Sequence, residues 1–427
     1  MSERFADMSA GLARHVLDRM GSTGQPPERG ALQVNVATES YLDVLRDEYL
    51  RPMKEYGRNS TFKLVQAPFG GGKTQFLHCL RELAWIEGFA TCLVGLSPKE
   101  CPFDRPVLIY REVARRIELP AESLTSPLSS GIDQVLQRIA VQRIDEHGPD
   151  AFLAWLGEVF LRANIESRSF ARAVRSFLEA MVSGDMDEAD LFGDYLRGET
   201  IDSRELSGHR LREKLEDDNA FRWLRSLVQV LAALELPGVV LLFDEMDRNM
   251  SLSTRRRRDI GDNLRQMIDY CGQSLLPGVL WCYAVPPEFL DTVVPEYPAL
   301  AQRLKGAQRF SAMSPMQPVI DLDHLPLGAT QLLESIGQRL LELAEHGYQY
   351  SYDHDIQAKN LAALAREFGE RSFESGTRRQ FVKAAVGLLD RQRREGESSL
   401  DEDGIRELTG ASGSGTGPAM MPGESEF

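Results

Sequence analysis

The sequence predicts an α/β fold in which a parallel sheet carries a glycine-rich loop, with a large helical insertion and a C-terminal helical lid. Three observations lead to this prediction. A short apolar run leads into the glycine-rich loop at residues 66–74, and further apolar runs of strand length recur along the chain. Between about residues 120 and 235 the pattern is helical without a convincing strand, over a length that a simple crossover does not need. From Gly328 to Arg394 the pattern is helical again.

The glycine-rich loop lies between a strand-like run at 62–65 and an amphipathic helix that begins near Lys73. A strand, a glycine-rich turn and Lys-Thr at a helix start form the pattern of the phosphate-binding loop of P-loop proteins. Consecutive glycines let backbone N–H groups turn towards a phosphate, and the helix N-terminus adds partial positive charge. We expect Lys73 to reach the β- and γ-phosphates of a nucleotide, and the Thr74 hydroxyl to bind Mg²⁺.

The whole loop and the start of the helix are therefore candidate nucleotide contacts: Ala67, Pro68, Phe69, Gly70, Gly71, Gly72, Lys73, Thr74 and Gln75. One position departs from the pattern. Ala67 stands where G-x-x-x-x-G-K-[ST] has its first glycine, which is a known relaxation of the motif.

A second nucleotide motif is the apolar run 239–243, which ends in Asp244 and Glu245. A buried strand of this kind delivers Asp244 to the metal shell and places Glu245 to polarise an attacking water. Acidic pairs after apolar runs are common, so the motif gains its weight from the glycine-rich loop upstream.

Along the chain the pattern predicts alternating strands and helices. Further strands are expected at 90–96, 278–285 and 318–322, with a strand-like piece at 32–36, and helices at 41–49, 107–117, 132–144, 152–161, 170–181, 221–234 and 255–272. We expect an N-terminal helix and connector at 1–30, a core at 31–325, a lid at 326–395 and a disordered tail at 396–427. The N-terminal helix either caps the core or binds a partner.

Composition limits the function classes. With 42% hydrophobic and 26% charged residues the chain is typical of a globular protein, and its net charge of −15 gives no global attraction to nucleic acid. The five cysteines form no C-x-x-C pair and no leader is apparent, so we expect reduced thiols and a cytoplasmic location. The longest apolar run, 237–243, is too short for a bilayer, so no membrane role is expected.

Four consecutive arginines, Arg255 to Arg258, are a local exception to the acidic composition. They are compatible with contact to DNA phosphates, with contact to the nucleotide of an adjacent subunit, or with a simple solvated surface. No aromatic stacking platform accompanies them.

The order of these parts resembles an AAA+ ATPase and, more narrowly, the ATP-binding proteins of bacterial BREX-type phage-defence systems. The resemblance extends over about residues 30–395, and the segments that carry it are 67–77, 107–112, 242–245, 286–290, 297–300 and 379–383. It implies ATP and Mg²⁺ as cofactors, other defence proteins as partners, and a homo-oligomer or hetero-complex.

The resemblance also implies roles for two arginines. Arg379 matches the lid arginine that contacts the γ-phosphate, with the adjacent Arg378 as its rival, and Arg303 lies where such ATPases place an arginine finger for a neighbouring subunit. A surface position is the alternative for Arg303. One departure concerns the strand at 278–285, which ends without a polar side chain to help orient the water; Tyr283 has the nearest hydroxyl.

Two functions follow from these expectations. One is a Mg²⁺-dependent ATPase, with Lys73, Glu245, Arg379 and Arg303 in catalysis and Thr74 and Asp244 on the metal, acting in a defence complex on or near DNA. The alternative is a nucleotide-gated module that binds ATP with little turnover, which the missing polar residue favours. A small-molecule kinase suits the large insertion and the long lid less well.

Overall fold

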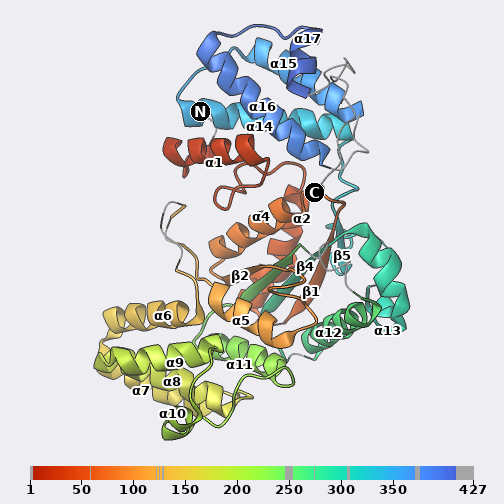
Figure 1. The fold of residues 1–427 in the computed structure, drawn as a ribbon. Helices are drawn as coiled ribbons and strands as arrows, with labels where there is room; N and C mark the ends of the chain where they lie inside the picture. The colour runs from red at the N-terminus through yellow and green to blue at the C-terminus, as the bar shows by residue number, and fades with distance from the viewer. Residues whose placement is uncertain are drawn as a thin grey trace, which may run out of the picture. The chain divides into compact units, whose positions relative to one another are not determined.

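The computed structural model describes residues 3–57, 59–121, 123–124, 126, 129–245, 253–273, 275–304, 308–370 and 376–409. The chain divides into two compact units (Figure 1). One unit is Pro26–Pro326, and the other combines Met1–Gln25 with Leu327–Phe427. The chain therefore passes between the units twice, after Gln25 and after Pro326.

The Pro26–Pro326 unit is built on a parallel five-stranded sheet, as predicted. Its strands are β1 (Thr61–Gln66), β2 (Ala90–Gly95), β3 (Val239–Asp244), β4 (Val279–Val285) and β5 (Val319–Asp321). Their order in the sheet is β2-β3-β4-β1-β5. Strands β1 and β2 are consecutive in the chain, but β3 and β4 lie between them in the sheet. The sheet and the helices around it form an α/β fold.

Helices cover both faces of this sheet. Before the sheet come α2 (Glu39–Leu45), a π-helical turn (Arg46–Leu50) and α3 (Arg51–Glu55); α4 (Lys73–Ile86) follows β1, α5 (Pro106–Arg116) follows β2, and α12 (Thr254–Gly272) follows β3. After β4 come a π-helical turn (Phe289–Val293), a 3₁₀ turn (Val294–Glu296) and α13 (Pro298–Leu304).

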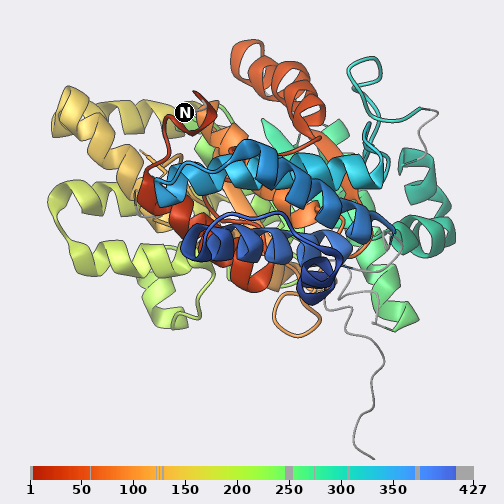
Figure 2. The same cartoon turned by 90° about the horizontal axis from the view of Figure 1, so that it is seen from above.

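The predicted helical insertion is confirmed between β2 and β3. After α5 it contains α6 (Ile132–His147), α7 (Pro149–Arg162), α8 (Arg168–Ser183), α9 (Met186–Arg197), α10 (Ser203–Gly208) and α11 (Ala220–Ala233). Figures 1 and 2 both show α6 to α9 gathered on the opposite side of this unit from α13.

Every residue of β3 and β4 is buried, which explains why these strands are continuous apolar runs. Side chains alternate between the two faces. Leu241 and Phe243 join the cluster that contains α5 and the insertion helices, whereas Val240 and Leu242 join the cluster that contains α2 and α4. Both faces of the sheet are thus closed, and the polar site is confined to the strand ends.

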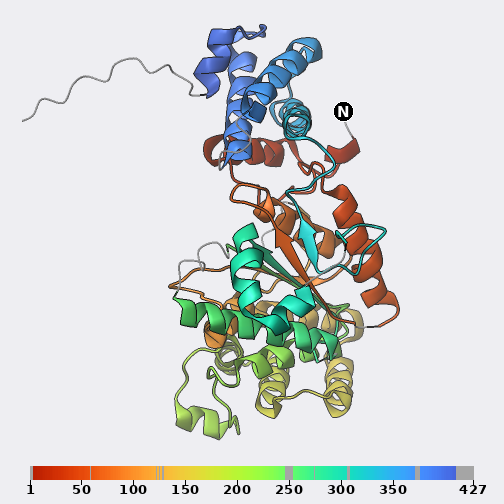
Figure 3. The same cartoon turned by 90° about the vertical axis from the view of Figure 1, so that its right-hand side faces the viewer.

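The second unit is helical. It contains α14 (Ala329–Tyr348), α15 (His354–Glu370), α16 (Thr377–Glu395) and α17 (Glu402–Thr409), together with α1 (Ala10–Thr23) and a 3₁₀ turn (Glu3–Phe5). Helix α1, coloured red, lies along α14 and α16 (Figure 3). The N-terminal helix thus packs on the C-terminal helices of its own unit.

Two further expectations differ from the structure. The strand-like piece at 32–36 is wrong, because residues 31–34 form a turn whose backbone N–H groups bond to a side chain and not to a neighbouring strand. Helix α17 lies inside the expected tail, while residues 410–427 fall outside the described residues. No helix in the described part of the chain combines the length and apolarity that a membrane crossing requires.

Candidate functional site

The loop after β1 depends on its three glycines for two different reasons. Gly70 and Gly72 have φ values of 76° and 96°, in the left-handed region that favours glycine. Gly71 has ordinary φ, but a Cβ there would lie 2.8 Å from the Ala67 Cβ and 2.9 Å from the Pro68 carbonyl oxygen. The backbone therefore folds more tightly at Gly71 than any side chain permits. This cradle fits the close approach of backbone N–H groups to a phosphate.

Lys73 is the first residue of α4, and its side chain lies over the loop. Its Nζ donates hydrogen bonds to the carbonyl oxygens of Ala67, at 2.8 Å, and Pro68, at 3.1 Å, and the residue is only 7% exposed. The ammonium is thus held beside the N-terminus of α4, where an anion is favoured. Phosphate oxygens placed there would be hydrogen-bonded by both.

The hydroxyl of Thr74 meets the end of β3. Thr74 Oγ1 donates to Asp244 Oδ2 at 2.6 Å, across 170 positions of sequence, and Asp244 is 6% exposed. A hydroxyl and a carboxylate beside a phosphate cradle are oxygen ligands of the kind that Mg²⁺ takes together with waters and phosphates. The described residues hold no cluster of three or more His, Cys, Asp or Glu that would bind a metal by protein groups alone. The Thr74 hydroxyl and the Asp244 carboxylate fit a Mg²⁺ that a nucleotide also binds.

Glu245 continues the chain beyond β3 in an unusual conformation. Its φ is 64°, and its N–H donates to Asp244 Oδ1 at 2.8 Å. A non-glycine residue in this region costs about 1–3 kcal/mol, and such strain concentrates at functional sites. The last residue of β2 leaves space for it, because a Cβ on Gly95 would lie 3.6 Å from Glu245 Oε2. Asp244 and Glu245, the acidic pair that the sequence predicts at the metal and the water, thus both lie at the carboxyl end of β3, and the Glu245 N–H fixes the Asp244 carboxylate.

The sequence reasoning missed a buried clasp on α4. Both oxygens of Glu82 accept hydrogen bonds from backbone N–H groups: Gly30 at 2.6 Å, Ala31 at 3.1 Å and Leu32 at 2.9 Å. Gln75 Nε2 donates to the Ala31 carbonyl at 2.9 Å. Burial raises the pKa of Glu82, while the three N–H donors oppose the rise. On the predicted helix Glu82 lies off the apolar stripe that contains Phe76 and Leu80, so no local signal separated it from a solvated acid.

Tyr283 was the nearest hydroxyl considered for orienting the attacking water, but its ring lies in the core. Its ring is fully buried and packs 4.9 Å from the Phe103 ring, between centroids, and burial raises the pKa of Tyr283 well above its ordinary value. The following residues, Ala284 and Val285, carry no polar side chain. The end of β4 therefore has no side-chain donor for a water.

Two arginines that were expected to contact other molecules, Arg303 and Arg256, instead form ion pairs within the Pro26–Pro326 unit. Arg303, in α13, pairs with Asp269 of α12 through an Nε–Oδ1 distance of 2.6 Å and also donates to a backbone carbonyl. Arg256 forms a two-bond pair with Asp104, at 2.7 and 2.9 Å, so it is not equivalent to its neighbours in the arginine run. Arg255 and Arg258 are exposed.

Arg378 and Arg379 lie in the first turn of α16, in the helical unit. The Arg379 backbone and side chain lie against the C-cap residue of α1, because a Cβ placed on Gly24 would come within 2.2 Å of the Arg379 Cγ. The structure thus attaches the expected lid arginine to the N-terminal helix.

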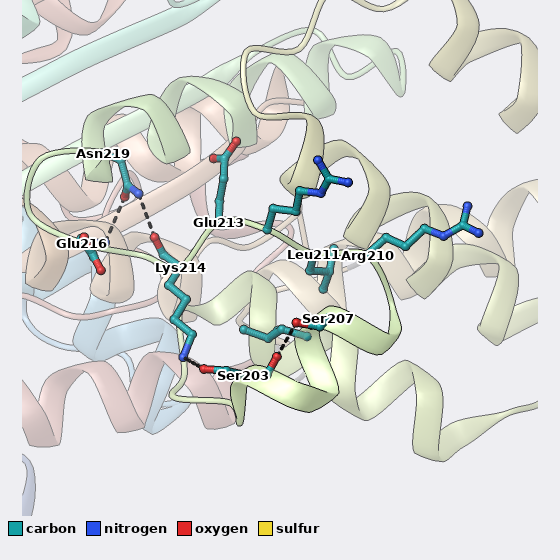
Figure 4. Close-up of a pocket in the computed structure, with 10 residues that line it drawn as sticks. Ser203, Ser207, Arg210, Leu211, Glu213, Lys214, Glu216 and Asn219 are labelled. Atoms are coloured by element: carbon teal, nitrogen blue, oxygen red, sulfur yellow. Dashed lines mark hydrogen bonds between the residues drawn. The ribbon is translucent and has the colours of Figure 1, made fainter.

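A separate pocket of about 700 Å³ lies in the insertion around α10 (Figure 4). Two of its charged side chains are hydrogen-bonded to serines: Lys214 Nζ donates to Ser203 Oγ at 2.7 Å, and Glu213 accepts from the Ser167 hydroxyl at 2.9 Å. Figure 4 shows Arg210 directed away from Lys214 and Ser203. These side chains do not converge on a common point, so the loop after β1 remains the candidate site.

Comparisons with known proteins give a family match and similar solved structures. The family described as BREX system ATP-binding protein BrxC/D matches residues 10–404. Two solved structures of the Aeropyrum pernix ORC2 protein, one of ADPNP-ADP complexes and one of the ADP form, are similar at 12% and 13% sequence identity. They match 90% and 92% of this chain and 70% and 72% of the ORC2 chain, each with a TM-score of 0.46. No curated protein matches the chain.

Proposed function

The chain belongs to the family of BREX system ATP-binding proteins BrxC/D, and we propose that it is a Mg²⁺-dependent ATPase whose turnover drives rearrangement of a DNA-associated defence complex. The observation that carries the proposal is the hydrogen bond of 2.6 Å between Thr74 Oγ1 and Asp244 Oδ2. It joins the phosphate cradle to the acidic strand end, which is the juxtaposition that phosphoryl transfer needs.

The roles of the residues follow from their positions. The N–H groups of the cradle and the ammonium of Lys73 stabilise negative charge on the phosphoryl group as it transfers. Thr74 and Asp244 would hold Mg²⁺, which neutralises charge on the phosphate oxygens. Glu245, turned by its left-handed backbone, orients and polarises the attacking water. The loop residues Pro68 and Phe69 enclose the phosphates.

Two arginines complete the proposed site. Arg379, at the start of α16, contacts the γ-phosphate and links it to the helical unit. Arg303 reaches the nucleotide of a neighbouring protomer in an assembly, after exchanging its ion pair with Asp269 for that contact. Arginines supplied in this way raise phosphoryl-transfer rates by about 10³–10⁵ in related systems.

A nucleotide-gated switch with little turnover is the second candidate. It is favoured by the end of β4, where Ala284 and Val285 offer no donor to the water and the Tyr283 ring is buried in the core. The strained backbone of Glu245 favours the ATPase, because a merely structural acid at a strand end does not require a left-handed φ.

ATP turnover by the purified protein, with and without DNA, tests the proposal. We expect Lys73→Ala to weaken ATP binding strongly with an unchanged thermal melt, since its charge faces the cradle. Glu245→Gln should retain ATP and stop turnover, because it removes the water-polarising carboxylate while leaving Asp244 in place. Unchanged ATP affinity in Lys73→Ala contradicts the site, and parental turnover in Glu245→Gln contradicts the chemistry.

A further inference from the structure

Helix α1 packs on α16 with almost no space between the two backbones. A Cβ on Gly21 would lie 2.7 Å from the Val386 Cγ1. A Cβ on Gly24 would lie 2.2 Å from the Arg379 Cγ and 2.7 Å from the Arg379 carbonyl oxygen. Real Cβ atoms essentially never come within 3.0 Å of another heavy atom in this way, so the close approach of the helices favours glycine at both positions.

Gly24 has a second reason to be glycine. It is the C-cap of α1, its φ is 64°, and its N–H donates to the Met20 carbonyl at 2.8 Å. A left-handed residue at this position ends the helix and turns the chain away. The chain therefore leaves α1 at the very residue that touches Arg379.

A few residues later the chain is fastened to the P-loop helix α4. Arg81 donates to the Glu28 carbonyl, and Glu82 accepts from the N–H groups of Gly30, Ala31 and Leu32. Arg29 adds hydrogen bonds to the carbonyls of Ser123, at 3.2 Å, and Ser126, at 2.9 Å. Residues 28–32 thus belong rigidly to the unit that contains the nucleotide site.

Between these two attachments lie only Gln25, Pro26 and Pro27. Each proline fixes its own φ and restricts the residue before it, so consecutive prolines favour an extended and stiff connection. A stiff link transmits a displacement that a flexible link of the same length would absorb.

We propose that residues 24–32 form a strap that couples Arg379 to the P-loop helix, with Gly24 as a positioning residue for the Arg379 guanidinium. The strap rests on the proposed role of Arg379 at the γ-phosphate. When Arg379 engages the nucleotide, α16 and α1 shift, and the strap transmits this shift to the segment held by Glu82 and Gln75. In the reverse direction, a shift of that segment moves Arg379 into position for catalysis.

Matched glycine variants test the strap. Gly24→Ala places a methyl group against Arg379, whereas Gly21→Ala places one against Val386 in the same helix pair. Because a misplacement of about 1 Å can cost on the order of 100-fold in rate, we expect Gly24→Ala to lower kcat at least about tenfold with a smaller change in ATP affinity. Gly21→Ala should lower the melting temperature comparably and retain kcat.

A double-mutant cycle shows whether Gly24 acts through the arginine. In the Arg379→Ala background, Gly24→Ala should have no further effect on kcat, because the group that it positions is gone. Effects that simply multiply, or equal kcat losses for Gly24→Ala and Gly21→Ala, would overturn the strap. If Arg379→Ala itself retains parental turnover and ATP affinity, the proposed role of Arg379 fails, and that result is distinct from the first two.

A second variant covers the case in which Gly24→Ala does not fold. Pro26→Gly combined with Pro27→Gly loosens the connection without touching Arg379 or Glu82. Hydrogen exchange at the amides of residues 30–32 is the readout: ATP should slow it in the parent and much less in the double variant. Equal ATP-dependent protection in both proteins contradicts the strap.

Discussion

Lys63 offers a prediction that can be worked out quantitatively. It lies in β1, the strand that leads into the phosphate cradle, and is 1% exposed. Its Nζ donates to the Tyr49 hydroxyl at 2.8 Å and to the carbonyls of Pro315 and Gln317, both at 2.9 Å. The rings of Tyr49 and Phe310 lie 4.4 and 5.0 Å from the ammonium. A buried cation therefore ties β1 to the segment before β5.

Burial lowers the pKa of Lys63 from its ordinary 10.5 to about 8. Between these two pH values the unfolded chain binds more protons than the folded chain, so the free energy of unfolding rises with pH. Below about pH 8 Lys63 is protonated in both states, and the folded protein bears the full free-energy cost of burying the ammonium. Over the whole window the linkage amounts to about 3 kcal/mol, and from about pH 7 to about pH 9.5 it amounts to about 2 kcal/mol.

The assay is urea unfolding at these two pH values, for the parent and for Lys63→Met. All four tryptophans, Trp85, Trp155, Trp223 and Trp281, belong to the Pro26–Pro326 unit, so their fluorescence reports the unit that contains Lys63. The parent should gain about 2 kcal/mol in the free energy of unfolding relative to the variant as the pH rises.

The absolute stability of Lys63→Met is not the readout, since the change also leaves three oxygens without their donor. Burial raises the pKa of Tyr49 and of Cys282 to about 12, so both stay neutral in the folded protein throughout the window. In the unfolded chain they titrate alike in the parent and in Lys63→Met, so the comparison of the two proteins cancels their contribution. The same pH dependence in both proteins would refute the assignment of the linkage to Lys63.

Two predictions concern the arginines. Turnover per protomer should rise with protein concentration. Arg303→Ala should remove this rise while sparing ATP binding, whereas Asp269→Asn, which releases Arg303 from its ion pair, should keep the rise. If turnover per protomer is independent of concentration in all three proteins, Arg303 is a structural residue paired with Asp269. Arg255→Ala and Arg258→Ala should weaken DNA binding, and each should reduce the slope of log affinity against log salt concentration by about 1. Arg256→Ala should mainly lower the melting temperature, because it breaks the pair with Asp104. Anisotropy titrations with DNA at several salt concentrations measure the affinity, and an unchanged affinity in the first two variants contradicts a DNA role.

The features that could be predicted from sequence are those that contiguous residues determine. The strands β3 and β4 are apolar because both faces of the sheet are covered, so their hydropathy alone marks them. The glycine loop is similarly local: the conformations of Gly70 and Gly72 and the crowding at Gly71 explain the residue type at each position.

Long-range partners could not be predicted, because tertiary packing selects them among many chemically equal candidates. Asp104 pairs with Arg256 across 152 positions, and nothing local distinguishes Arg256 from the other three arginines of the run. The segment at 32–36 has the alternation of a strand, yet the Leu32 N–H donates to Glu82, 50 positions away, and not to a neighbouring strand. The packing of α1 on α16 likewise depends on glycines whose neighbours are distant in sequence.

The buried charges on α4 show why such partners matter to function. Arg81 and Glu118 form an ion pair of 3.6 Å with side chains only 8% and 5% exposed. A buried pair gains little net stability, because desolvation of both charges offsets their attraction, and apolar residues of similar size often serve as well. Its effect here is positional: Arg81 also donates to the Glu28 carbonyl and lies over Trp85. The charges therefore hold residues 28–32 in one place on the P-loop helix, and a strap can transmit movement only if its end is fixed in this way.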